Sequence, residues 1–277
     1  MRRILISFIL TLTLTYFLLG QETNKILDEG KLLFRLEKAS WYGTDDFLVR
    51  FPNKLDSIGG YLSYVNDKNQ VINIFFKMGN TNHIFVRYQF DSIPEAKPIT
   101  IDSLNYVATQ TEIDLITIRQ DALQKISDNS DNFFTFYKNT SFNLIPLITK
   151  GERKVFILTG PQISNLVIIG NDYLLTYDNK NRFVKKEKIH QSMLQYPYKS
   201  DKSDYKLETT YHSHVLSDCI SSTDICTLLL YKDFVEWKQH YVISKKYVSI
   251  FDLEKENLVI ITKKAWDKIS KHRNEKK

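Results

Sequence analysis

Short segments that alternate apolar and polar residues, separated by polar turns, constrain this chain more than any other feature. Between about residues 31 and 100 the segments FLVRF, GGYLSYV, QVINIFFKM and HIFVRYQF follow one another, and turn residues such as Asn66-Asp67, Gly79-Asn80 and Pro94 separate them. Alternation with a period of two is typical of strands with one buried face. The sequence therefore predicts an antiparallel meander here, covered by a helix on one face.

Helix and strand patterns alternate along the rest of the chain. Residues 110–130 have apolar residues at helical spacing. Pro146, Lys150 and Gly151 interrupt the pattern, which predicts a domain boundary between about residues 140 and 152. New strand-like segments follow, then a strand in ETTYHSH, a helix in SSTDICTLLLYKDFVEW, two further strands and a short terminal helix. The predicted class is α+β, with an antiparallel β-rich domain over residues 21–145 and an α/β domain over residues 146–270.

The first twenty residues have the build of a secretory signal. Two arginines form a basic start, residues 4–19 are apolar, and Gly20 precedes a polar segment that begins at Gln21. The apolar run approaches the length that spans a bilayer, but three threonines weaken it. The sequence predicts a signal peptide over residues 1–20, and hence an exported protein, periplasmic or secreted, without a stable membrane span after cleavage.

Charge and cysteine content exclude several classes of protein. Without the two arginines of the signal, the 38 basic residues become 36 against 32 acidic residues, a mild and scattered net charge of +4. The lysine-rich end, residues 271–277, is predicted to be a solvated basic tail, so no nucleic-acid partner is expected. Cys219 and Cys226 form no disulfide framework; in an oxidising compartment they either form one bridge or stay as two thiols.

The segment YHSHVLSDCISSTDI, residues 211–225, carries the strongest functional signal. His212 and His214 are two residues apart, so in a strand both imidazoles lie on the same face. Asp224 falls at the start of the next predicted helix, where its carboxylate can close the set. Two histidines, one carboxylate and an open fourth position are what a catalytic zinc ion requires. The pattern predicts a zinc site formed by these three residues.

A second interpretation of the segment requires no metal. Ser221-Ser222-Thr223-Asp224 has the spacing of a capping box, in which Ser221 caps the helix and Asp224 reaches back to it. Two histidines on a partly exposed strand need no ligand. The combination of both halves in the right order favours the metal site over coincidence.

The segment HSH…SSTD resembles the signature of the JAMM metalloproteases, also called JAB or MPN-plus. The resemblance covers roughly residues 150–265, and it implies a JAMM-like (deaminase-like) fold for the predicted α/β domain. It further implies that His212, His214 and Asp224 bind zinc and that Ser221 stabilises the oxyanion formed from a peptide or protein substrate. The loop between His214 and Ser221 is one residue shorter than usual, and Val215 stands where a proline is common.

The glutamate that serves this family as general base has no unique counterpart here. Glu152, just before KVFILTG, lies at a family-like distance from His212 in the sequence, and Glu208 precedes His212 by four residues. Glu152 is the first choice and Glu208 the second, with no base at all as the third possibility. Without a base, the factor of about 10² to 10⁴ that acid–base catalysis contributes would be lost.

Three hypotheses follow for function. The first is an exported zinc peptidase or isopeptidase, in which a zinc-bound water attacks an amide carbonyl. The second is a catalytically inactive JAMM-like binding or structural module of the cell envelope. The third is an effector whose N-terminal half recognises a partner. Of the remaining histidines, His190 is predicted to lie in a charged turn with Glu187, and His240 at a surface or interface.

Overall fold

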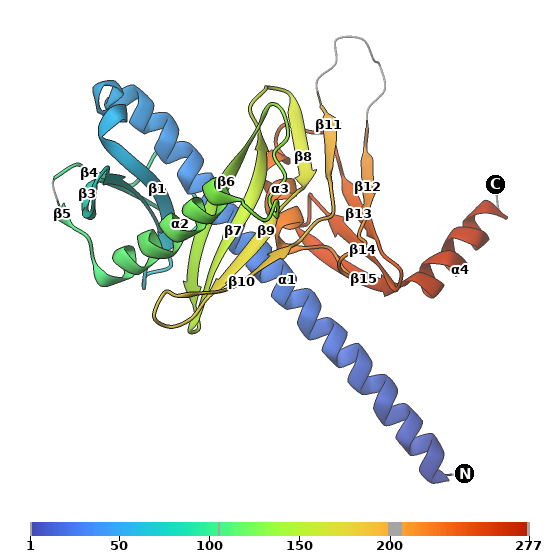
Figure 1. The fold of residues 1–277 in the computed structure, drawn as a ribbon. Coiled ribbons are helices and arrows are strands. Elements are labelled where there is room, and N and C mark those ends of the chain that lie inside the picture. Colours follow the sequence, from blue (N-terminus) through green and yellow to red (C-terminus); the bar gives the residue numbers. More distant parts are fainter. Residues whose placement is uncertain (1, 105, 199–206, 276–277) are drawn as a thin grey trace. The chain divides into compact units, whose positions relative to one another are not determined.

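The chain combines helices with several mainly antiparallel sheets in a computed structural model, which describes residues 2–104, 106–198 and 207–275 (Figure 1). The predicted α+β class is confirmed. The chain divides into two compact units. The first unit comprises Met1–Lys31 and Ser200–Lys277, and the second comprises Leu32–Lys199. The last two residues of the predicted basic tail lie outside the described residues, and the tail up to Asn274 belongs to a terminal helix.

One long helix, α1 (Arg2–Arg50), begins the chain and belongs in part to each unit. In the second unit Phe34 and Ala39 of this helix are buried. Its other buried positions there are Leu33, Leu36, Ser40, Gly43 and Phe47. These positions are spaced by three or four residues, which is the period of a helix with one face in the core. The prediction of a strand at residues 47–51 is therefore wrong, because this apolar segment is the last turn of a helical pattern that starts well before it.

The helix contacts the first sheet closely at one glycine. A Cβ added at Gly43 would lie 2.1 Å from Oδ1 of the buried Asn73, so only a residue without a side chain fits there. One turn further, the rings of Phe47 and Phe75 stack with 4.2 Å between their centroids. The small residue lets the helix approach the sheet, and the aromatic pair closes the contact.

The predicted antiparallel meander is confirmed in this first sheet. Its strands follow the order β1-β2-β3-β4, with β5 paired to β3. Their bounds, after a short 3₁₀ helix at Pro52–Ser57, are β1 (Ile58–Val65), β2 (Val71–Lys77), β3 (Asn80–Phe90), β4 (Thr100–Asp102) and β5 (Tyr106–Val107). Strand β2 is buried along almost its whole length. Side chains on both faces of β2 are buried, which explains why five of its seven residues are apolar rather than alternating with polar residues.

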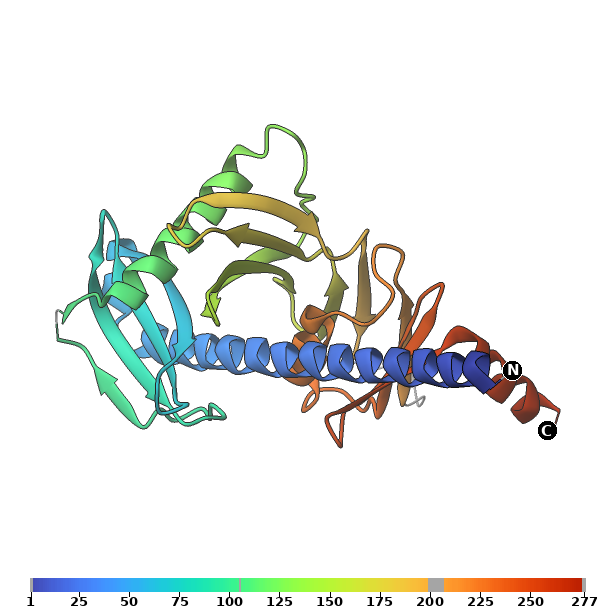
Figure 2. The same cartoon turned by 90° about the horizontal axis from the view of Figure 1, so that it is seen from below.

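Helix α2 (Gln110–Asp128), the green helix in Figure 2, contributes side chains to two hydrophobic cores of the second unit. Leu115 and Ile116 pack with the first sheet, whereas Ile118 and Ala122 pack with the second. The second sheet has the order β10-β9-β7-β6, and a two-stranded sheet pairs β11 with β8. Their bounds are β6 (Thr140–Thr149), β7 (Glu152–Pro161), β8 (Leu166–Gly170), β9 (Tyr173–Tyr177), β10 (Phe183–Lys188) and β11 (Met193–Pro197).

The residues that suggested a domain boundary form a hairpin instead. Pro146 lies in β6, which is an edge strand, and edge strands tolerate a missing N–H donor. Lys150 and Gly151 have φ values of 51° and 79°, and two consecutive positive values make the tight turn between β6 and β7. The expected boundary at 145/146 thus falls inside a strand, and the two compact units divide the chain elsewhere.

The C-terminal part of the first unit is a mixed sheet with the order β12-β13-β14-β15. Strands β12 and β13 pair in parallel, and the helix between them in the sequence, α3, forms the crossover, whereas the other pairs are antiparallel. The elements are β12 (Thr209–Ser213), α3 (Ser222–Tyr231), β13 (Gln239–Ile243), β14 (Tyr247–Asp252), β15 (Asn257–Thr262) and α4 (Lys263–Asn274). The predicted strand–helix–strand order is confirmed, with a shorter helix.

Helix α1 continues without a break across the expected cleavage point after Gly20. Signal cleavage and export stay predictions of the sequence. Within the described residues, no helix combines the length and the apolar character needed to cross a membrane.

The buried carboxylate of Glu112 gives a test of the second unit. It accepts hydrogen bonds from Nε and Nη2 of Arg87, both at 2.8 Å, and from the Tyr64 hydroxyl at 3.0 Å. Burial raises the pKa of Glu112, but the bonds from Arg87 and Thr109 outweigh burial and leave the pKa below its usual value of 4.5. This contribution to stability is therefore complete above pH 4.5 and is lost as the pH falls through the lower folded-state pKa.

We expect Glu112→Gln to lower the free energy of unfolding by about 3 kcal/mol at pH 7, because Arg87 loses its charged partner in a buried site. The exposed Glu95 provides the matched control, Glu95→Gln, with a change below about 0.5 kcal/mol. Urea denaturation at pH 7 and at pH 3.5 measures both. A Glu112→Gln protein as stable as the wild type at pH 7 would contradict the importance of this ion pair.

Candidate metal centre

The candidate site lies where β12 ends and α3 begins. His212 is in β12, His214 follows the last residue of that strand, and Asp224 is in the first turn of α3. In sheets with parallel strands joined by helices, ligands bind beyond the carboxyl ends of the strands. The topology of the first unit thus brings all three predicted ligands to such an end.

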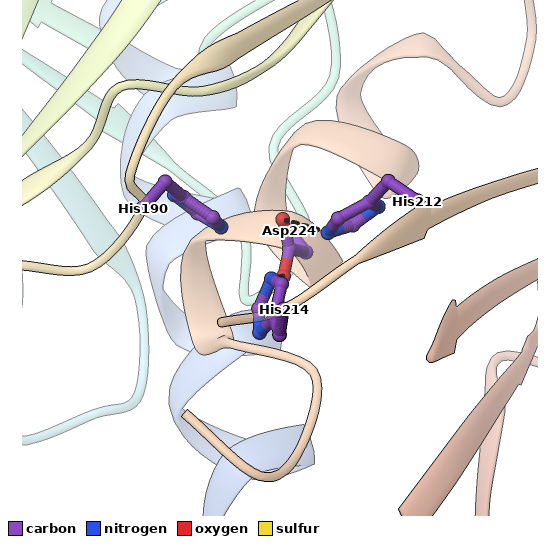
Figure 3. A group of neighbouring side chains, drawn as sticks. All are labelled: His190, His212, His214 and Asp224. Carbon is purple, nitrogen blue, oxygen red and sulfur yellow. Dashed lines mark ion pairs between the residues drawn. The ribbon is translucent and has the colours of Figure 1, made fainter. Parts of the chain in front are cut away.

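The three side chains converge, and both histidines lie within ion-pair distance of the carboxylate (Figure 3). Nε2 of His212 lies 3.6 Å from Oδ1 of Asp224, and Nε2 of His214 lies 3.2 Å from Oδ2. Two ligand atoms that each lie about 2 Å from a tetrahedral zinc ion are about 3.3 Å apart. All three residues are buried, with Asp224 only 1% exposed. Their spacing fits a single small cation.

A backbone carbonyl determines the tautomer of His214. Nδ1 of His214 lies 2.8 Å from the carbonyl oxygen of Cys219 and 2.7 Å from the hydroxyl of Ser217. A carbonyl can only accept, so Nδ1 carries a proton and donates it to Cys219. In the neutral imidazole the lone pair is then on Nε2, the atom that faces Asp224. Metal-binding histidines are oriented in the same way, by a hydrogen bond at the other ring nitrogen.

His212 is held at Nδ1 by another histidine. Nδ1 of His212 lies 2.7 Å from Nε2 of His240, and Nδ1 of His240 lies 2.6 Å from the Thr210 hydroxyl. The prediction that His240 lies at a surface or interface is wrong, since its side chain is completely buried. Burial, with the neighbouring His212, lowers the pKa of His240 to about 3, so this ring is neutral at physiological pH.

The capping box expected from the second interpretation is also present. Ser221 is the N-cap of α3, and its hydroxyl oxygen accepts from the backbone N–H of Asp224 at 3.0 Å. In return, Oδ2 of Asp224 accepts from the backbone N–H of Ser221 at 2.9 Å and lies 2.8 Å from the Ser221 hydroxyl, which can donate to it. One carboxylate therefore caps the helix and faces two histidines. The two interpretations of the segment are not exclusive.

Both glutamates considered as general base are held in ion pairs with lysines. Glu152 begins β7 in the second unit, and its carboxylate lies 2.6 Å from Nζ of Lys154. Glu208 immediately precedes β12 and lies 2.6 Å from Nζ of Lys238. Four residues of strand correspond to about 13 Å, so Glu208 is that far along the chain from His212. Both side chains are more than half exposed.

A fourth buried side chain that can serve as a metal ligand is His190, which Figure 3 also draws. It belongs to the second unit, where Nδ1 lies 3.4 Å from Oδ2 of Asp172. His190 was predicted to lie in a charged turn with Glu187, but its side chain is buried beside the buried Asp172. The apolar strand β8, which ends just before Asp172, was the sequence signal that this carboxylate lies in the interior.

The two cysteines of the first unit are both free thiols. Cys226 is buried in α3, and Cys219 is partly buried in the loop before it. Burial raises the pKa of the Cys219 thiol to about 11, so the thiol is protonated at physiological pH. Cys219 contributes to the site through its backbone carbonyl instead.

Comparison with known proteins assigns no family to this arrangement. No protein-family model, no curated protein and no solved structure matches the chain.

Proposed function

We propose that this chain binds one divalent metal ion through Nε2 of His212, Nε2 of His214 and a carboxylate oxygen of Asp224. The observation that carries the proposal is the hydrogen bond from Nδ1–H of His214 to the carbonyl of Cys219. It leaves the lone pair of Nε2 only 3.2 Å from a carboxylate oxygen. Two electron-rich atoms at this distance require a cation, either a metal ion or a proton, between them.

The donor set favours zinc. Two imidazole nitrogens and one carboxylate are typical ligands of Zn²⁺, whereas Mg²⁺ and Ca²⁺ prefer oxygen donors throughout. A buried carboxylate is also costly without a positive partner. Both hydrogen bonds from Ser221 go to Oδ2 of Asp224. They leave the negative charge of the carboxylate in place, and a divalent ion would neutralise it.

The competing explanation is that a proton takes the place of the metal. An imidazolium at His214 would form an ion pair with Asp224, and the carboxylate would serve the capping box and this pair without a metal ion. The two explanations differ at Asp224. A metal ion needs its negative charge, whereas the cap needs only an oxygen acceptor, which asparagine also has.

We expect the untagged full-length chain to contain about one zinc ion per molecule, as measured by elemental analysis after dialysis. Asp224→Asn and His212→Ala should each lose the metal, because each removes a ligand. Ser221→Ala should keep it, because the three ligands remain and the backbone N–H of residue 221 still donates to the Asp224 carboxylate. The exposed His272 gives a control, His272→Ala, with unchanged zinc content.

The Ser221 variant separates capping from coordination. Loss of an N-cap destabilises a protein by about 1 kcal/mol, so Ser221→Ala should unfold at lower urea concentration while still binding zinc. A folded wild-type chain that takes up no metal from added zinc would contradict the proposal. The segment would then be a capped helix beside a histidine ion pair.

Peptide or isopeptide hydrolysis of the JAMM-like kind is a second candidate function. The first unit supplies three protein ligands, which is the number in catalytic zinc sites, whereas structural sites have four. Zinc in such a site polarises an amide carbonyl as a Lewis acid. In this proposal Ser221 donates a hydrogen bond to the developing oxyanion and Glu152 moves the proton. The alternative is a metal-binding module of the cell envelope that does not turn over substrate.

We expect a zinc-loaded hydrolase to cleave members of a fluorogenic peptide library, with His212→Ala inactive. If Glu152 moves the proton, Glu152→Gln should lower kcat by about 10²-fold to 10⁴-fold, and Glu208→Gln should leave it within about twofold. The reverse result would assign the role to Glu208. Zinc binding without cleavage of any peptide would favour the binding module.

A further inference from the structure

The hydrogen-bonded chain Thr210–His240–His212 can run in two directions. In one direction Nδ1–H of His212 donates to Nε2 of His240, and Nδ1–H of His240 donates to the Thr210 oxygen. In the other, the Thr210 hydroxyl donates to Nδ1 of His240, and Nε2–H of His240 donates to Nδ1 of His212. Each neutral imidazole carries one proton in both cases, so the two directions have the same number of protons.

Only one direction leaves His212 able to bind a metal at Nε2. When His212 accepts at Nδ1, its single proton is on Nε2, which points at Asp224 and is closed to a metal ion. When His212 donates from Nδ1, the lone pair is on Nε2. His214 has only one possible tautomer, because its Nδ1 must donate to the carbonyl of Cys219. A backbone carbonyl therefore sets the tautomer of His214, whereas another side chain sets that of His212.

The parallel register of β12 and β13 creates this chain. Thr210 is the register partner of His240, and His212 lies two residues further on the same face of β12. All three side chains are buried, with Thr210 only 2% exposed. The distances of 2.6 Å and 2.7 Å are short enough for two well-formed hydrogen bonds.

We propose that His240 and Thr210 are positioning residues that hold His212 in its metal-binding tautomer, with the Thr210 oxygen as the terminal acceptor. This inference rests on the proposed metal site and adds to it His240 and Thr210, which are one and two hydrogen bonds away from the ligand His212. Loss of the Thr210 oxygen favours the opposite tautomer of His240, whose Nε2–H then donates to His212 and moves the His212 proton to Nε2.

The test is zinc affinity, measured by competition with a chromophoric chelator on the full-length chain. We expect Thr210→Val, which has nearly the same shape but no hydroxyl, to weaken zinc binding about 10-fold to 100-fold, the range found for partners of metal ligands. Thr210→Ser keeps the hydroxyl and should bind within about threefold of wild type. Thr209→Val is the matched control, because Thr209 is exposed and lies on the other face of the same strand.

Nitrogen-15 NMR of histidine-labelled protein gives a second readout that does not depend on affinity. The zinc-loaded wild type should show protons on Nδ1 of both His212 and His240. The Thr210→Val protein without metal should show them on Nε2. Circular dichroism establishes that each variant is folded.

The outcomes separate the inference from the metal site itself. A wild type that binds zinc together with a Thr210→Val protein that binds equally tightly would overturn the inference and leave the metal site intact. Equal weakening by Thr209→Val would also overturn it, because the effect would then be one of strand stability. A folded wild type that takes up no zinc would overturn the proposed metal site, and the inference with it.

Discussion

The carboxylate of Asp224 is the group on which the candidate site depends. It closes the capping box with Ser221 and so begins α3, the helix that connects the two parallel strands of the first unit. The same carboxylate faces Nε2 of His212 and of His214. Because the cap fixes the position of the carboxylate, the geometry of the candidate ligands is established by the fold before any ion binds. Such preorganisation reduces the ordering that binding would otherwise require.

The two histidines show how a buried imidazole is made into a ligand. Each has its Nδ1 engaged in a hydrogen bond, one to a backbone carbonyl and one to a second histidine, and each directs Nε2 to the carboxylate. A polar group that is this well buried must have its hydrogen bonds satisfied, and the partners also decide which nitrogen carries the proton. A metal ion and a proton are the two cations that suit such a site.

Local sequence patterns predicted much of the fold. The strands of the meander, helix α2 and the order β12–α3–β13 were predicted to within a few residues from periodicity, and the start of α3 also from its capping box. The prediction of a strand at residues 47–51 was wrong, because the alternation of these five residues was considered without the longer helical pattern of α1, which ends there. It also misplaced a boundary at Pro146, because a proline that breaks a central strand is acceptable in the edge strand β6.

The sequence by itself determined that His212 and His214 share a face and that Ser221 and Asp224 cap a helix, because both relations depend only on spacing along the chain. The tertiary structure alone decided that His240 lies beside His212 and that His190 is buried with Asp172. The contact between His212 and His240 depends on the pairing and register of β12 and β13, which are separated in the sequence by a loop and a helix. Spacing cannot reveal such a contact, because the register of two strands is set by the burial of their faces and by packing across the whole sheet.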